Sequence, residues 1–106
     1  MSYTIERSIP ADHPSLAGHF PGNPVVPGVV ILEEVVLAVS AWREDFRVVG
    51  APSVKFIAPL RPERTFTINL SGDERRVRFE CIRQKTVFAR GELSVTVASA
   101  LGQMQT

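Results

Sequence analysis

Apolar and polar residues alternate along two segments in the second half of the chain. Residues 65–70 and 77–82 follow this two-residue period, which predicts two strands. Residues 71–73, Ser-Gly-Asp, lie between them and predict a hairpin turn. We expect residues 87–98 to form the last long strand and the small, polar tail from residue 99 to fray.

The first half of the chain predicts two further strands with less regular patterns. Residues 3–9 alternate weakly and precede Pro10, so we expect a short first strand that ends there. Residues 46–57 are strand-like with an interruption near Gly50 and Pro52. Pro59 and Pro62 mark the turn that follows.

Residues 29–43 contain neither Gly nor Pro and include several β-branched side chains, which locally favour a strand. Fifteen residues are too many for a typical strand, so we predict a helix instead. This helix is apolar on nearly all sides, and we therefore expect it to be largely buried.

The segment from residue 10 to residue 28 holds five prolines and three glycines. That density excludes regular structure and predicts a stiff loop. His19 lies in this loop, where stiffness would hold the imidazole in place.

One buried helix followed by antiparallel strands is an α+β plan, and we expect a single domain over residues 1–106. The strands must wrap the helix, because nothing else is left to cover it. A single sheet leaves part of the helix and one sheet edge uncovered. We therefore expect a dimer with one continuous sheet.

The bulk properties exclude several classes of protein. The net charge of +1 argues against a nucleic-acid-binding protein. The single cysteine, Cys81, rules out an internal disulfide, and we expect it to be a buried structural thiol, with neither metal nor cofactor. No apolar stretch is long enough to span a membrane, and the first residues have no apolar signal core, so we expect a cytoplasmic protein.

His19 and Glu33 are the candidate catalytic residues. An imidazole in a rigid loop and a carboxylate in an apolar segment suit acid–base elimination chemistry. Burial among Val29, Leu32 and Leu37 would raise the pKa of Glu33. Each residue alone has a plainer interpretation. A histidine in a loop is commonly structural, and Glu33 could simply lie on the exposed face of the helix. Glu33 and the adjacent Glu34 point about 100° apart on a helix. Only one of the two carboxylates can face the most buried side, and the motif described next implies that it is Glu33.

The run Gly-His-Phe-Pro-Gly-x-Pro-x-x-Pro-Gly-Val over residues 18–29 is followed by Glu33, fourteen positions after His19. It resembles the signature of the 3-hydroxyacyl-(acyl carrier protein) dehydratases, the FabZ/FabA family. His13 lies outside the run and is expected only to terminate the first strand. A glutamate rather than an aspartate at position 33 favours the plain dehydratase branch over the isomerising one.

The resemblance implies a hotdog fold and dehydration of a 3-hydroxyacyl thioester, held on acyl carrier protein, to the trans-2-enoyl thioester in fatty-acid or related acyl-chain biosynthesis. It implies that backbone amides of Gly28 and Val29 polarise the thioester carbonyl. It also implies that His19 and Glu33 of one site belong to different subunits of a homodimer, or of a higher multiple of dimers. The expected pocket residues are Phe20, Pro21, Val26, Pro27 and Leu37.

Two positions depart from the family: Leu37 stands where members often carry Gln, and Val26 replaces the usual Met. Two alternative functions stay open. A hotdog thioesterase is disfavoured by the His-Phe-Pro-Gly motif, and a non-catalytic partner subunit is supported only by Leu37.

Ten of the twelve basic residues are Arg, and several cluster between residues 61 and 90. This cluster predicts a carrier-protein docking face at Arg61 and Arg64, with Arg83, Lys85 and Arg90 as weaker candidates. Solvated strand faces explain the cluster equally well.

Overall fold

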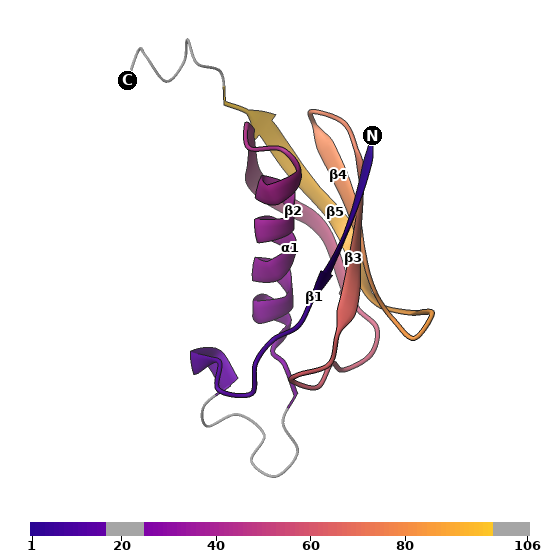
Figure 1. Cartoon of the computed structure of the whole chain (residues 1–106). Helices are drawn as coiled ribbons and strands as arrows, with labels where there is room; N and C mark the ends of the chain where they lie inside the picture. The colour runs from indigo at the N-terminus through magenta and orange to yellow at the C-terminus, as the bar shows by residue number, and fades with distance from the viewer. Residues whose placement is uncertain (17–24, 99–106) are drawn as a thin grey trace.

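The computed structural model describes residues 1–16 and 25–98. One antiparallel sheet packs against one long helix (Figure 1). The elements are β1 Ser2–Arg7, a short 3-10 helix η1 Pro14–Leu16, α1 Gly28–Trp42, β2 Phe46–Phe56, β3 Phe66–Gly72, β4 Arg76–Arg83 and β5 Thr86–Val97. The strand order is β1-β3-β4-β5-β2. The predicted α+β plan is confirmed, and each expected strand and the helix are present.

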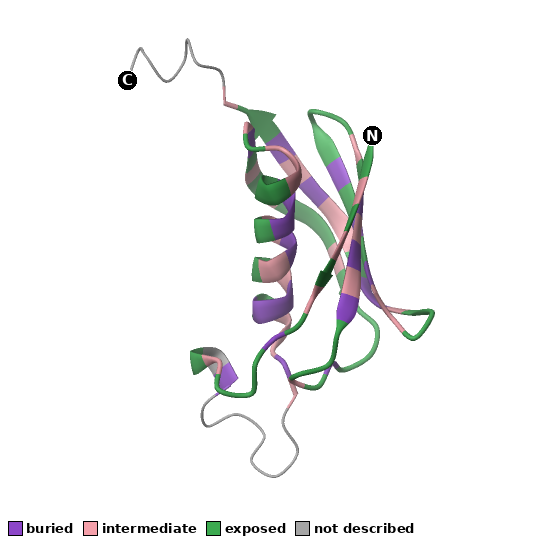
Figure 2. Cartoon of the chain, viewed as in Figure 1, coloured by how far each residue is buried: buried purple, intermediate pink, exposed green. Residues whose placement is uncertain are grey.

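The core lies between α1 and the inner face of the sheet. Buried residues form a stripe along the side of α1 that faces the strands (Figure 2). The helix contributes Val30, Ile31, Val35, Ala38 and Val39 to this core. The opposite side of α1 is exposed, so the expectation of a largely buried helix is wrong for the single chain. One sheet can cover only one side of a helix.

Cys81 lies on the inner face of β4 and is fully buried. Burial raises the pKa of its thiol to about 12, because the charged thiolate loses its hydration there. The prediction of a structural thiol is confirmed.

Strand β2 is at the edge of the sheet and pairs with β5 alone among the described strands. Its register shifts between Val48 and Gly50 and again between Gly50 and Ser53, which confirms the predicted interruption. Pro52 lies within this bulged stretch, where an edge strand tolerates a residue without an N–H donor. The outer edge of β2 has no partner strand in the part of the chain that the structure describes.

The hairpin between β3 and β4 turns two residues later than predicted, because Gly72 is still part of β3. The Asp73 carboxylate accepts hydrogen bonds from the N–H groups of Arg75 (2.8 Å) and Arg76 (3.1 Å). These bonds close the turn and lower the pKa of Asp73, since they stabilise its charged form.

The proline-rich segment contains η1, so the expectation that it lacks all regular structure is wrong. A single short turn beginning at Pro14 is compatible with proline at its first position. Residues 17–24 and the tail from residue 99 lie outside the described residues. No helix of the described chain is long and apolar enough to cross a membrane.

Candidate functional site

Glu33 lies in the middle of the exposed side of α1. Val29 and Leu37, one turn before and one turn after it, are 62% and 54% exposed. The hollow around Glu33 has a volume of about 390 Å³. Its lining is Val29, Leu32, Glu33, Val36 and Leu37, so among the described residues Glu33 is the one charged side chain in it. The spacing of four residues places this stripe opposite the face that packs on the sheet.

The expectation that Glu33 faces the buried side of the helix is therefore wrong for the single chain, and Glu34 takes that place. Arg7 of β1 donates from Nε to Oε1 of Glu34 (2.8 Å), and its Nη2 forms an ion pair with the same oxygen (2.7 Å). The Glu34 side chain is only 15% exposed. Glu34 consequently ties α1 to β1, while Glu33 remains available to a substrate or a partner.

Glu34→Gln should lower the free energy of unfolding by about 0.5–1 kcal/mol, because the ion pair with Arg7 is partly exposed and screened. Chemical denaturation at low and high salt measures the loss, which should shrink as salt rises. Glu74→Gln, at an exposed turn position, is the matched control and should be neutral. Equal stability of the two variants would show that the Arg7–Glu34 pair contributes nothing.

His19, Phe20 and Pro21 lie outside the described residues, so their predicted roles remain predictions. His13 lies in the turn between β1 and η1, where its N–H donates to the carbonyl of Pro10 (3.1 Å). Strand β1 already ends at Arg7, six residues before His13, so the expectation that His13 terminates this strand is wrong.

Both flanks of the proline-rich segment are attached to the turn that follows β2. The N–H of Glu63 donates to the carbonyl of Ile9 (2.7 Å), and the N–H of Val26 donates to the carbonyl of Leu60 (2.8 Å). Glu63 adopts a positive φ of 64°, which is uncommon for a residue with a side chain. These bonds attach the segment after β1 and the segment before α1 to the turn between β2 and β3 (Figure 1).

Gly28 and Val29 open α1, after Pro27 at the N-cap position. The first N–H groups of a helix have no acceptor within it and point along the positive end of its dipole. This start borders a cavity of about 300 Å³. Its lining is Val25, Val26, Gly28, Ile31, Phe56, Ile57, Ala58, Pro59 and Leu60. Amide donors beside an apolar cavity are suited to hold a carbonyl oxygen that gains charge.

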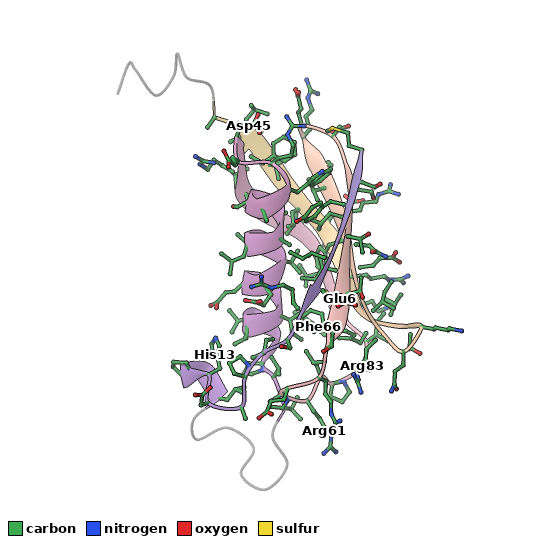
Figure 3. The ribbon with its side chains drawn as sticks, in the orientation of Figure 1. Glu6, His13, Asp45, Arg61, Phe66 and Arg83 are labelled. Atoms are coloured by element: carbon green, nitrogen blue, oxygen red, sulfur yellow. The ribbon has the colours of Figure 1, made fainter. Side chains whose placement is uncertain are left out.

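The predicted docking residues Arg61 and Arg64 are exposed at this same end of the molecule. They line a hollow of about 480 Å³ together with Ala11, Pro62 and Glu63. Figure 3 shows Arg61 at this end, below the start of α1.

The weaker docking candidates are dispersed. Arg83 donates to the backbone carbonyl of Thr65 (3.2 Å), and Lys85 lies in the turn between β4 and β5. Arg90 lines a hollow on the sheet with Lys55, Arg78, Glu80 and Glu92. The basic cluster of the sequence is thus not one continuous face.

A five-stranded sheet around one helix is shared with known structures. The dehydratase heterocomplex ApeI:P from Xenorhabdus doucetiae has a TM-score of 0.79 at 21% identity, covering 90% of this chain and 87% of that one. A hot-dog-like protein from Thermanaerovibrio acidaminovorans has a TM-score of 0.71 at 14% identity, covering 99% and 86%. The fold is a hotdog fold, as predicted.

The chain belongs to the ApeI-like family, described as ApeI dehydratase, whose pattern it matches over residues 1–92. It is also 32% identical over 104 residues to the 3-hydroxyacyl-[acyl-carrier-protein] dehydratase FabZ of Chloroflexus aggregans. That alignment covers 91% of this chain and 66% of the relative. The resemblance seen in residues 18–33 thus extends over most of the chain.

Sequence reasoning missed Phe56, whose ring lies against Gly28. An ideal Cβ added to Gly28 would come within 2.7 Å of Cε2 and 2.8 Å of Cζ of this ring. The only sequence signal was a large apolar residue at the end of the edge strand, just before Pro59. Its contact with a residue 28 positions earlier depends on how α1 lies across the sheet.

Proposed function

We propose that this protein dehydrates a 3-hydroxyacyl thioester, carried on acyl carrier protein, to the trans-2-enoyl thioester. The observation that carries the proposal is the match to a dehydratase family over residues 1–92, which includes the run from Gly18 to Glu33. The structure adds support, because Glu33 is the only charged side chain that the described part of the chain contributes to an apolar hollow on α1. Low polarity around a carboxylate suits proton transfer to a leaving hydroxyl.

In the proposed reaction His19 removes a proton from the carbon next to the thioester carbonyl. The electron pair forms the new double bond, while the bond from the β-carbon to its hydroxyl breaks. Glu33 donates a proton to that hydroxyl, which leaves as water. Backbone amides of Gly28 and Val29 hold the carbonyl oxygen as it gains charge, since they stand at the positive end of α1.

The proposed active form is a homodimer in which His19 of one chain faces Glu33 of the other. Two exposed features support it. The stripe around Glu33 on α1 is apolar, and the outer edge of β2 carries exposed apolar residues, including Val49 and Phe56. Unpaired strand edges and apolar stripes are typical of surfaces that a second copy covers.

The expected cytoplasmic location remains part of this proposal.

Replacing Arg61 and Arg64 together by Glu should raise the apparent Michaelis constant for substrates on acyl carrier protein about tenfold at low salt. Charges at the rim of a site act mainly on the rate of encounter, and salt screens them. A small pantetheine thioester should be almost unaffected. Charge reversal of Arg75, exposed in the turn between β3 and β4 at another part of the surface, is the control. An equal loss on both substrates would mean that Arg61 and Arg64 serve the fold or the catalytic site instead.

One assay tests the proposed function against its alternatives. The interconversion of 3-hydroxybutyryl and crotonyl thioesters is followed by the absorbance of the enoyl group, while free thiol is measured in parallel. Dehydration without thiol release supports the proposal. Thiol release without enoyl formation would identify a thioesterase. Neither reaction would favour the non-catalytic partner subunit.

A further inference from the structure

Among the described residues, the ring of Phe56 lies nearest to Gly28 at the start of α1. Its Cε2, Cζ and Cδ2 atoms would lie 2.7, 2.8 and 3.1 Å from a Cβ at Gly28. The edge of the ring therefore occupies the space that any other residue at position 28 would fill. The ring is nevertheless 47% exposed, so it is not simply part of the core.

Phe56 is held in this place by backbone bonds on both sides of the cavity. In the β2–β5 pairing, Phe56 lies opposite Ala89 of β5. The N–H of the next residue, Ile57, donates to the carbonyl of Phe88 (2.8 Å). On the opposite wall, the N–H of Val26 donates to the carbonyl of Leu60 (2.8 Å). The described residues contribute no charged side chain to the lining of the cavity between these walls. The backbone that carries the ring is thus anchored, and the ring forms an apolar wall beside the first turn of α1.

We propose that Phe56 is a positioning residue that keeps the first backbone N–H groups of α1 dry and correctly placed. Water near these donors would compete for the carbonyl oxygen and raise the local dielectric. A hydrogen bond to a developing negative charge is stronger where water is excluded. The ring contacts Gly28, so it acts through the backbone there rather than on the reacting atoms.

This inference rests on the proposed dehydration, and it predicts a particular kinetic signature. Phe56→Ala should lower kcat about tenfold with the Michaelis constant changed less than about twofold, because the donors matter most in the transition state. This is less than the 10²–10³-fold loss typical of removing a whole donor, since the N–H groups remain. Phe56→Tyr retains the ring and should restore most of the wild-type kcat.

A spectroscopic measurement separates this role from a structural one. The carbonyl stretch of an isotope-labelled crotonyl-pantetheine should move to lower frequency on binding to the wild type. The shift should be smaller on binding to Phe56→Ala. Val97→Ala is the matched control, since Val97 is an exposed apolar residue at the end of β5, outside the cavity lining. It should leave kcat and the carbonyl shift unchanged, while light scattering checks the assembly of both variants.

Three outcomes would overturn the inference. A wild type that neither dehydrates nor binds the thioester would remove the proposed function and this role with it. An active wild type with an unchanged kcat and carbonyl shift in Phe56→Ala would remove the role of Phe56 alone. A raised Michaelis constant with an unchanged kcat would make the ring a wall for substrate binding instead.

Discussion

His19→Ala and Glu33→Gln should each lower the rate of dehydration by about two orders of magnitude or more, the usual scale for a group that transfers a proton. Folding should hardly change in Glu33→Gln, because this side chain is exposed on α1 and no ion pair within the described residues depends on it. Enoyl absorbance measures the rate, and thermal unfolding checks the fold.

The control for this pair is Glu44→Gln rather than Glu34→Gln. Glu44 is an exposed carboxylate just beyond the end of α1, whereas Glu34 is bonded to Arg7 and its loss would disturb the packing of the helix. Turnover close to the wild type in either His19→Ala or Glu33→Gln would remove the assigned acid–base role of that residue.

Mixing inactive His19→Ala chains with inactive Glu33→Gln chains should restore activity to about a quarter of the wild-type level. If two chains share each site, half of the randomly mixed dimers are heterodimers and each contains one intact site. The recovery is measured as dehydration after the chains have exchanged, with exchange shown by mass-tagged subunits. Light scattering should show a dimer in dilute solution.

Each variant mixed with itself is the control and should stay inactive. No recovery despite complete exchange would place His19 and Glu33 of each site in one chain. A monomer by light scattering would contradict the dimer and would leave the apolar stripe around Glu33 without its expected cover.

The sequence predicted the elements better than the surroundings of single residues. Alternation defined β3 and β4, and the length of the Gly- and Pro-free segment defined α1, because these patterns are local properties of backbone geometry. The disturbance of β2 at Gly50 and Pro52 was also visible. The β3–β4 turn was placed two residues early, since Ser71 and Gly72 favour turns locally but pair with β1 and β4 in the sheet.

By itself, the sequence determined the fold class, the helix that carries Glu33 and the family resemblance in residues 18–33. Only the tertiary structure decided which side of α1 meets the sheet, and therefore that Glu34 bonds to Arg7 while Glu33 stays exposed. It alone placed Phe56 against Gly28. The physical reason is that the sequence of a helix apolar on nearly all sides does not predict which of its sides will pack against the sheet. The packing of the sheet decides this through contacts distant in sequence.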